Sequence, residues 1–359
     1  MKVLFISHTY PPITGGVETQ NYDLSVWLAK QSQIRLIVNK KRWLIPFFLV
    51  YSAFKAIFLA RNYDVIVLGS CLLGNIGWAV KKFTNKPVVA VAHGLDLTWK
   101  NKFYQSLWVG KFIPSLDKLI AVGNETVRIA VEKGIAPEKI VFIPNGIDLQ
   151  KYPGSSSKGE LEKLIGEEIG NKKTILTSGR LAKRKGVAWF IDNVMPKLPD
   201  QVIYIVAGDG PDRENIQEAI LKNNLEKRVK LLGYVTDPVR DMLFHTCDVF
   251  VQPNIEIAGD TEGFGISVIE AAYCGIPVVA ARLEGLQDAI KDGQNGFLIE
   301  SRDAGSYARK INELLSDDSF RKNFGEKARQ YVVENYSWDK ISKKYLEEIE
   351  SAIPKSPNS

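Results

Sequence analysis

The chain has 359 residues, a length that fits two domains of ordinary size. Hydrophobic residues make up 45% and charged residues 25%, so a substantial core is available and global disorder is disfavoured. The net charge of +6 suits an anionic ligand or membrane surface and does not indicate a nucleic-acid partner.

Three cysteines, Cys71, Cys247 and Cys274, lie far apart in the sequence. Their odd number disfavours a disulfide framework and indicates a reducing, cytoplasmic location. No Cys-x-x-Cys or His-x-x-x-His pair is present, which disfavours a structural zinc site. Lys2 is followed by only a short apolar run, so we expect no signal peptide.

The first half of the chain alternates short apolar runs with amphipathic segments, a pattern typical of α/β domains. A pair of glycines, Gly15 and Gly16, follows the first run and would let the backbone approach a ligand closely, although an ordinary turn is the more frequent role of such a pair. His93 follows the fourth run, at the sheet edge where doubly wound folds bind ligands. We predict strands at residues 2–7, 34–38, 64–68, 87–92, 117–122 and 140–143, and helices at 19–30 and 47–59.

Residues 43–60 form the longest apolar stretch. It is close to the length of a membrane span, but a proline, a serine and a lysine interrupt it, so we predict a buried or interfacial helix. The basic run 40–42 precedes it directly, a combination that suits anionic lipid headgroups. A buried helix with an exposed basic turn is the alternative.

The second half opens with predicted strands at 173–178, 202–207 and 248–251, each followed by a loop with polar or glycine residues. The first loop carries Gly179, Arg180 and Lys185. The charges of Arg180 and Lys185 would converge at the sheet edge, and the alternative is an exposed basic loop without a ligand. Gly208 and Asp209 follow the second strand, and Tyr234 and Val235 follow another apolar run.

Glu262 and Glu270 frame the most informative segment. Gly263, Phe264 and Gly265 would leave backbone N–H groups unpaired at a helix start, where a phosphate binds readily. We predict a loop, a helix and a strand here, with Glu262 in the loop and Glu270 about two turns into the helix. At 1.5 Å per residue, a helical spacing of eight residues puts the two glutamates about 12 Å apart. That is too far for a glycosidase pair, and it suits two ends of one elongated ligand. A surface helix with two solvated glutamates is the alternative.

These motifs, in this order, resemble glycosyltransferase family 4, the group 1 retaining glycosyltransferases. The loop at 252–261 looks closest to the phosphatidylinositol mannosyltransferase branch. Two positions depart from the family pattern: Gly123 stands where a serine is common, and Leu283–Asp288 replaces the usual Gly-Gly-x-Pro-Glu, which puts that local turn in question. The matching segments are Gly15–Glu18, His93-Gly94, Pro144–Asp148, Gly179–Gly186 and Glu262–Glu270.

The resemblance implies the GT-B fold, two facing Rossmann-like, doubly wound domains. We expect an acceptor-side domain at residues 1–165, a donor domain at 166–336, a helix at 337–352 that crosses back to the first domain, and a tail at 353–359. The implied reaction is metal-independent transfer of a hexosyl group from a GDP- or UDP-sugar to a lipid-linked or glycan acceptor, in cell-envelope or polysaccharide synthesis. The implied location is the cytoplasm, with a possible peripheral place on the inner face of the membrane.

The resemblance also implies roles for individual residues. Glu270 holds the ribose hydroxyls and Glu262 the sugar hydroxyls; Arg180 and Lys185 clamp the diphosphate, and His93 supports the sugar near its reacting carbon. No metal and no cofactor beyond the nucleotide-sugar co-substrate is expected. The implied donor-binding residues are Gly15, Gly16, Gly179, Gly208, Asp209, Tyr234, Val235, Gly263, Phe264, Gly265, Ile266 and Glu270.

Two other functions fit the same fold. A nucleotide-sugar 2-epimerase would convert the donor without any acceptor. A non-catalytic sugar-nucleotide-binding subunit would bind without turnover, although the complete set of Arg180, Lys185, Glu262 and Glu270 argues against it.

Overall fold

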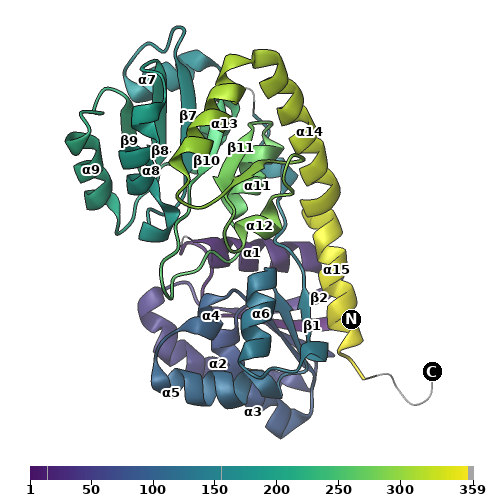
Figure 1. Cartoon of the computed structure of the whole chain (residues 1–359). Coiled ribbons are helices and arrows are strands. Elements are labelled where there is room, and N and C mark those ends of the chain that lie inside the picture. The colour runs from purple at the N-terminus through teal and green to yellow at the C-terminus, as the bar shows by residue number, and fades with distance from the viewer. Residues whose placement is uncertain (14, 155, 355–359) are drawn as a thin grey trace. The chain divides into compact units, whose positions relative to one another are not determined.

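The computed structural model describes residues 1–13, 15–154 and 156–354. These residues form two compact units, which are described one at a time (Figure 1). The first unit combines Met1–Gly146 with the segment that begins at Trp338, and the second is Ile147–Ser337.

The first unit is built on a six-stranded parallel sheet in the order β2-β1-β3-β4-β5-β6. The strand order reverses between β1 and β3, and in such sheets ligands bind beyond the carboxyl ends of the strands at this reversal. The strands are β1 Lys2–Ser7, β2 Gln33–Val38, β3 Val65–Leu68, β4 Val88–Ala92, β5 Lys118–Ala121 and β6 Ile140–Phe142. The helices are α1 Gly16–Ala29, α2 Ile45–Ala60, α3 Gly74–Thr84, α4 Leu95–Thr98, α5 Lys102–Tyr104, α6 Asn124–Glu132 and α15 Trp338–Ser351.

Alternate side chains of β1 enter two different cores. Val3 and Phe5 point to one face of the sheet, and Leu4 and Ile6 point to the other; all four are fully buried. Because successive side chains of a strand face opposite sides, a strand covered by helices on both faces must be apolar at every position. This explains why the first strands appear in the sequence as continuous apolar runs.

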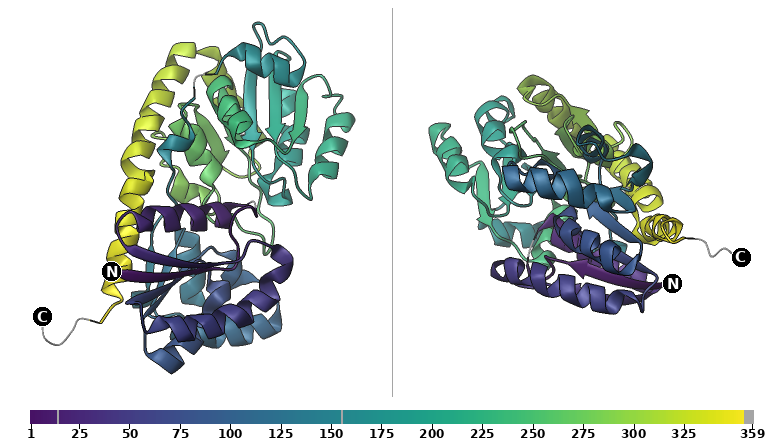
Figure 2. Two further views of the ribbon diagram at one scale, coloured as in Figure 1. Left: turned by 180° about the vertical axis from the view of Figure 1, so that it is seen from behind. Right: turned by 90° about the horizontal axis from the view of Figure 1, so that it is seen from below.

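The last helix of the chain, α15, belongs to the first unit. It lies beside α1, as Figure 2 shows from behind. Trp338, Ile341, Tyr345 and Ile349 form one apolar stripe at helical spacing and complete a core of the first unit. Trp338 packs directly against Gly146, where an added Cβ would lie 2.5 Å from the indole.

Helix α2 is buried along one stripe only, made of Phe48, Ser52, Ala56 and Leu59. Within the residues that the structure describes, Arg42–Ala60 is the one helix that is long and apolar enough to cross a membrane by length and composition. Only 28% of its apolar window is buried inside the protein.

The second unit has a six-stranded parallel sheet in the order β12-β11-β10-β7-β8-β9, with its reversal between β7 and β10. The strands are β7 Lys173–Ser178, β8 Val202–Ala207, β9 Val229–Gly233, β10 Val249–Gln252, β11 Val278–Ala281 and β12 Phe297–Ile299. The helices are α7 Lys158–Ile165, α8 Val187–Asn193, α9 Arg213–Lys222, α10 Asp237–Thr246, α11 Ile266–Tyr273, α12 Leu286–Ala289, α13 Ala304–Ser316 and α14 Asp318–Tyr336.

The division between the units lies earlier in the chain than the boundary we expected after residue 165. Tyr152 and Leu161 are buried in a core of the second unit, together with residues of β10, α10 and α11. Tyr152 and Leu161, which we expected in the first domain, therefore belong to the second unit.

Candidate functional site

Three loops of the second unit are joined at the carboxyl edge of its sheet. The amide of Gly179, after β7, donates a hydrogen bond to Ala207 O at 2.9 Å, and the amide of Gly208, after β8, donates to Gly233 O at 2.7 Å. A Cβ added to Gly208 would lie 1.8 Å from Gly179 O, so the two loops touch through their backbones. Of the predicted site residues, Gly179 and Gly208 thus lie in direct backbone contact, and neither contributes a side chain there.

Asp209, Tyr234 and Val235 extend from the same edge. The Asp209 carboxylate is exposed and lies 3.8 Å from the guanidinium of Arg213. The Tyr234 side chain is 69% exposed, while Val235 packs partly against the core. An exposed aromatic ring at a ligand-binding edge offers a flat apolar face on which a planar base can stack.

The two cations predicted as a diphosphate clamp have different environments. Arg180 is exposed, and its guanidinium contacts no charged or hydrogen-bonding side chain among the described residues. Lys185 is buried, and its Nζ lies 2.5 Å from Oε2 of Glu262. Arg180 is therefore available to an anion, whereas the charge of Lys185 is already paired with a glutamate.

Glu262 is a buried carboxylate surrounded by donors. Besides Lys185, it lies 3.8 Å from Arg184 Nη2 and accepts a hydrogen bond from Asn254 Nδ2 at 3.3 Å. Burial alone would raise the pKa of Glu262, but Lys185 and Arg184 lower it to about 2. Burial also lowers the pKa of the Lys185 ammonium, against the effect of the glutamate. Glu262 is thus ionised throughout the physiological pH range.

The turn that departs from the usual family pattern supports the Glu262 loop from behind. The Glu284 carboxylate accepts a hydrogen bond from the Glu262 amide at 2.5 Å, and the Gly285 amide donates to Glu262 O at 3.1 Å. A Cβ added to Gly285 would lie 2.3 Å from Gly263 O. The unusual sequence at 283–288 therefore still forms a turn packed against the site.

Helix α11 begins at Ile266, so Glu262 lies in the loop before it and Glu270 lies in the helix, as the sequence predicted. Gly265 has a φ of +84°, a left-handed conformation that favours glycine and ends the loop before the helix. The separation of Glu262 and Glu270 therefore does not follow from helical rise. The Phe264 side chain is buried against Tyr336 in the core, which leaves only its backbone for a ligand.

The backbone amides of Gly263, Phe264 and Gly265 donate no hydrogen bond within the described part of the chain. Such donors at a helix start, together with the helix dipole, favour an anion. The unpaired amides that the sequence predicted are thus found next to Glu262, and phosphate binding there stays a prediction.

Glu270 is buried in the second turn of α11 and is held by groups that the sequence did not reveal. Arg240 Nη2 of α10 lies 3.9 Å from Glu270 Oε1 and donates a hydrogen bond to Tyr152 Oη at 3.3 Å. The two glutamates are therefore held by separate cations. Lys185 and Arg184 hold Glu262, and Arg240 holds Glu270.

The sequence interpretation missed five residues of these clusters: Arg184, Asn254, Glu284, Arg240 and Tyr152. Arg184 was within reach, because it lies inside the basic loop that carries Lys185. Asn254 and Glu284 lie in the segments 252–261 and 283–288, which the sequence marked as family features without assigning a role to either residue. Arg240 and Tyr152 come from a helix and a loop elsewhere, and nothing in the linear pattern distinguishes them from surface polar residues.

The first unit holds the remaining predicted residues. Gly15 precedes α1, and a Cβ added to it would lie 2.4 Å from Oε2 of Glu18. The same carboxylate accepts a hydrogen bond from Thr9 Oγ1 at 2.7 Å. No atom lies within 4 Å of a Cβ added to Gly16. Gly15 thus makes room for Glu18, and Gly16 borders open space.

His93 follows β4, and its Nε2–H donates to Gly69 O at 2.9 Å. Its backbone amide donates to Asp96 Oδ1 at 3.0 Å, so both the backbone and the ring are held in place. Nδ1 remains as the ring acceptor. His8, at the end of β1, lies nearby; burial and His93 lower the pKa of His8 to about 4.

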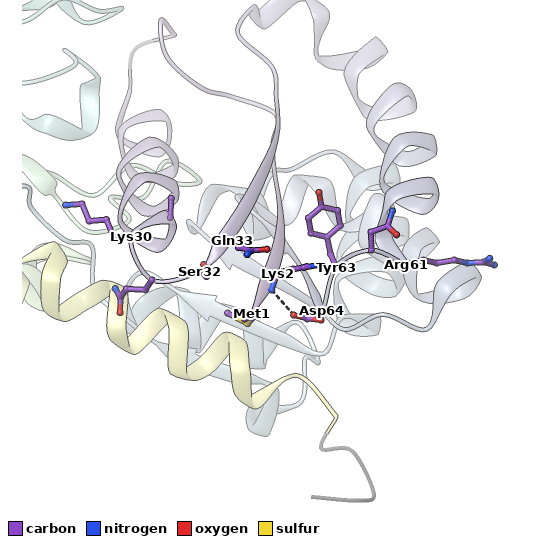
Figure 3. A pocket seen from close by; sticks show the side chains of 11 residues that line it. Met1, Lys2, Lys30, Ser32, Gln33, Arg61, Tyr63 and Asp64 are labelled. Atoms are coloured by element: carbon purple, nitrogen blue, oxygen red, sulfur yellow. Dashed lines mark hydrogen bonds between the residues drawn. The ribbon is translucent and has the colours of Figure 1, made fainter.

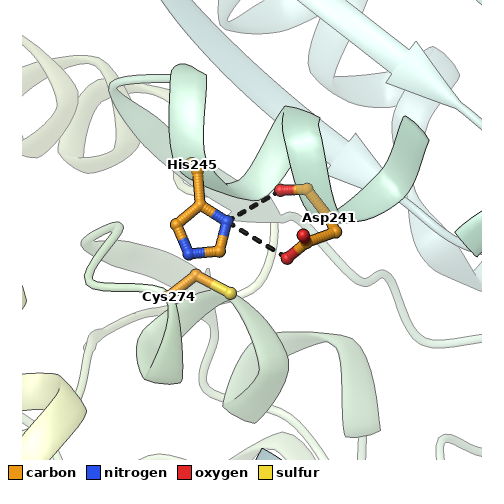
Figure 4. Close-up of side chains that lie close together, drawn as sticks. All are labelled: Asp241, His245 and Cys274. Atoms are coloured by element: carbon orange, nitrogen blue, oxygen red, sulfur yellow. Dashed lines mark hydrogen bonds and ion pairs between the residues drawn. The ribbon is translucent and has the colours of Figure 1, made fainter. Parts of the chain in front are cut away.

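Asp241, His245 and Cys274 gather between α10 and the end of α11, with their ligand-type atoms within 4.8 Å of one another (Figure 4). His245 Nδ1 lies 2.9 Å from Asp241 O and 3.2 Å from Asp241 Oδ1. Among the described residues, these three side chains form the one group of this kind with metal-ligand chemistry. Its hydrogen bonds join the histidine to its own helix.

A shallow depression of about 580 Å³ lies at the opposite, amino-terminal edge of the first sheet (Figure 3). Lys2, Gln33 and Asp64 line it where β1, β2 and β3 begin, and the Lys2 amide donates to Asp64 Oδ2 at 2.7 Å. Ligands of parallel α/β sheets bind at the carboxyl edge, so this depression is not the candidate site.

Comparison with known proteins identifies the family. The profile described as "Glycosyltransferase Family 4" matches residues 14–151, and that described as "Glycosyl transferases group 1" matches 161–331. The GDP-mannose-dependent alpha-(1-6)-phosphatidylinositol monomannoside mannosyltransferase of Mycolicibacterium smegmatis is 23% identical, over 94% of this chain and 95% of that protein. The UDP-Gal:alpha-D-GlcNAc-diphosphoundecaprenol alpha-1,3-galactosyltransferase of Escherichia coli is 29% identical, over 80% of this chain and 76% of that protein.

Among solved structures, HepE of Anabaena in complex with UDP has a TM-score of 0.80 at 23% identity, over 98% of this chain and all of that one. At this identity the likeness speaks for the fold. The two profiles together match most of each unit and include every motif from Gly15 to Glu270. The chain therefore belongs to the group 1 glycosyltransferases of family 4, with the two-domain α/β architecture called GT-B.

Proposed function

We propose that the chain transfers a hexosyl group, with retention of anomeric configuration, from a GDP- or UDP-linked sugar to a lipid-linked or glycan acceptor. The observation that carries this proposal is the ionised Glu262, held by Lys185 beside the free amides of the α11 start. A carboxylate fits sugar hydroxyls, and adjacent amides fit phosphate oxygens, so the two features suit the two parts of one donor.

The positive groups of this site support departure of the nucleoside diphosphate. Negative charge grows on the leaving phosphate oxygen as the glycosidic bond breaks, and donors already in position stabilise it. The exposed Arg180 and the amides of 263–265 would supply this stabilisation directly. Lys185 would keep Glu262 ionised and oriented, and would add its charge to the same region.

Retention without a covalent intermediate is the mechanism that this environment favours. Glu262 is committed to Lys185, Arg184 and Asn254, and its low pKa makes it a weak nucleophile. In a front-side transfer, the bond from the anomeric carbon to the phosphate oxygen breaks and the bond to the acceptor oxygen forms on the same face. The acceptor proton moves to the departing phosphate.

The donor nucleotide can be identified by thermal unfolding with UDP, GDP and ADP, followed by donor hydrolysis. The likeness to HepE, whose structure holds UDP, and to the UDP-Gal-dependent galactosyltransferase favours UDP. The likeness to the GDP-mannose-dependent mannosyltransferase favours GDP. We expect one of these two to raise the unfolding temperature more than ADP. Absence of any shift and of any donor hydrolysis would contradict the proposed function.

Two glutamate variants test the assignment of the donor's two ends. Glu270→Ala is expected to weaken nucleotide binding by about ten- to a hundredfold, because a hydrogen bond to a charged group contributes roughly 1.5–3 kcal/mol. Glu262→Ala is expected to lower mainly the turnover. Nucleotide affinity from calorimetry and turnover with saturating donor separate the two effects, and unchanged values in both variants would remove the assignment.

Product analysis on donor alone addresses the epimerase alternative, which the comparisons do not favour. A transferase releases nucleoside diphosphate and free sugar slowly, whereas an epimerase returns an isomeric nucleotide sugar. Appearance of the isomer would replace the proposed reaction.

We further propose that transfer needs no divalent metal. The amides and cations described above would do the work that a metal does in other transferases. Activity is expected to survive EDTA, both in the unchanged protein and in Cys274→Ser. The contrary result has three parts: the unchanged protein loses activity in EDTA, it regains activity when metal is added, and Cys274→Ser is inactive. That result would place a catalytic metal at Asp241, His245 and Cys274 and overturn this part of the proposal.

For the location we propose the cytoplasm and, with a lipid-linked acceptor, the inner face of a membrane in cell-envelope or polysaccharide synthesis. The three cysteines of the chain are all unpaired, as a reducing compartment requires.

A further inference from the structure

The first unit exposes large apolar side chains along one stripe of α2 and the short turn before it. Soluble proteins rarely expose a contiguous group of this kind unless another surface covers it. We call this stripe the α2 face. Its members and their exposed fractions are Trp43 (70%), Phe47 (71%), Val50 (61%), Tyr51 (55%), Phe54 (73%) and Phe58 (81%).

Helical geometry explains why these side chains gather. Phe47, Val50, Phe54 and Phe58 recur at intervals of three or four residues, so they lie on one side of the helix. The buried stripe that begins at Phe48 faces the core and α3. Helix α2 is therefore apolar on both sides, with one side covered by its own domain and the other side exposed.

The same buried stripe argues against a membrane-spanning position. Ser52 and Ala56 are fully buried, and the Ser52 hydroxyl donates to Phe48 O within the helix. To cross a bilayer, α2 would have to leave this core and uncover apolar neighbours on α3. A helix that keeps its inner stripe packed can only lie along a surface.

The charged residues of α2 and of the segments that flank it are all basic, and one of them, Arg42, has its Nη2 3.6 Å from Oε1 of Glu18 on α1. Residues 40–61 contain five basic residues and no acidic residue. Lys55 lies on the helix itself, with Nζ 2.6 Å from Tyr51 Oη and 5.0 Å from the ring centroid. The other four flank the two ends of the helix: Lys40, Lys41, Arg42 and Arg61.

A groove of about 410 Å³ lies beside the α2 face, between the helix and the end of β2. Leu44, Phe47 and Tyr51 line it on the helix side, and Lys40 and Lys41 on the other. Apolar walls with lysines at one side match a lipid, which has an apolar chain and an anionic headgroup.

We propose that the α2 face docks on a bilayer that carries anionic phospholipids, with α2 lying in the interface. The aromatic side chains enter the headgroup region and the upper acyl chains, and the basic residues pair with lipid phosphates. This inference rests on the proposed membrane location and not on the donor chemistry.

Sedimentation with vesicles tests the docking without any substrate. The protein is expected to bind vesicles of phosphatidylcholine mixed with phosphatidylglycerol at low salt, to bind phosphatidylcholine alone weakly, and to lose binding as salt is added. Each basic residue contributes about fivefold near an anionic surface, so K40Q/K41Q/R42Q is expected to weaken binding about a hundredfold. A matched control, K222Q/K227Q/K322Q, removes the same charge from the second unit and is expected to bind like the unchanged protein.

The apolar contribution needs its own variant. F54S/F58S is expected to reduce vesicle binding at least tenfold while the unfolding temperature and donor hydrolysis stay unchanged, because both side chains are exposed. Leu221→Ser, an exposed apolar position on α9, is the control.

Two outcomes overturn the proposal. One is the absence of binding to anionic vesicles at low salt. The other is a dimer or larger assembly in light scattering that F54S/F58S dissolves, which would show that a second copy covers the α2 face. Donor hydrolysis is measured separately, without vesicles. Failure of the vesicle experiment therefore does not count against the proposed transfer reaction.

Discussion

Arg180 and Lys185 are five residues apart, yet their environments predict opposite consequences of substitution. The exposed Arg180 has no partner to lose among the described residues, so Arg180→Ala should leave the unfolding temperature unchanged. It should weaken donor binding by about ten- to a hundredfold, the effect of losing one charge-assisted hydrogen bond. Arg180→Lys should recover only part of this, since an ammonium cannot fork across two phosphate oxygens.

Lys185→Ala should affect both stability and activity. It leaves Glu262 buried without its main partner, a change that costs about 3–5 kcal/mol in the free energy of unfolding. We expect turnover to fall about a hundredfold or more. Denaturant unfolding of K185A, E262A and the double variant checks the pairing: the double variant should regain much of the stability lost in K185A and none of its turnover. Purely additive stability losses would show that the two side chains do not act as a pair.

His8 predicts a pH dependence of stability. Its pKa is about 4 in the folded chain and about 6.5 in the unfolded chain, so the unfolded state binds the proton first as the pH falls. Folding should lose about 3 kcal/mol between roughly pH 6.5 and pH 4 from this group and nothing above that range. The difference in unfolding free energy between the unchanged protein and His8→Gln should follow this curve. A flat difference over that range would contradict it, and His245→Gln in the other unit serves as control.

At the scale of elements, close backbone contacts between loops decide the shape of the carboxyl edge of the second sheet, where we propose that the donor binds. Gly208→Ala would place a Cβ 1.8 Å from Gly179 O, so the loops after β7 and β8 must separate. We expect at least a tenfold loss of nucleotide affinity, measured by calorimetry. Gly293→Ala also has a positive φ but nothing within 4 Å, so it should show backbone strain of about 1 kcal/mol and normal nucleotide binding.

The attachment of α15 to the first unit gives a second prediction at this scale. Trp338 is 1% exposed and packs on Gly146, so Trp338→Ala should cost about 3–5 kcal/mol in the unfolding free energy. Amide hydrogen exchange should become faster in α1 and β1, because side chains of both elements pack in the same core as Trp338. Trp99→Ala removes an indole that is 52% exposed and should change little. Equal protection of α1 and β1 in both variants would contradict this role for α15.

For the whole molecule, the sequence predicted the alternation of strands and helices well, because strands covered on both faces must be apolar at every position. The run Val3–Ile6 shows this plainly. The loop and helix around the two glutamates were predicted as well, but their separation of about 12 Å assumed helical rise throughout, whereas α11 begins only at Ile266.

The pairing within the site lay beyond sequence reasoning for a different reason. Lys185 and Glu262 are distant in the chain and meet only because β7 and β10 are neighbours in the sheet. Arg240 and Tyr152 are likewise distant from each other in the chain and meet beside Glu270 only in the folded unit. The basic run before Trp43 was visible in the sequence, but the outward direction of Phe54 and Phe58 was not, because both sides of α2 are apolar.

The return of α15 to the first unit affects how the protein is made. During synthesis, the ribosome must add residues 147–337 after the first sheet is finished before Trp338 exists to cover it. At about 5–20 residues per second this delay is roughly 10–40 s. Throughout it, Leu24 and Leu28 of α1 lack the partners that bury them in the finished protein. The nascent chain therefore carries an uncovered apolar surface on its first domain until its last helix emerges, and chaperones that hold such surfaces have that interval in which to bind.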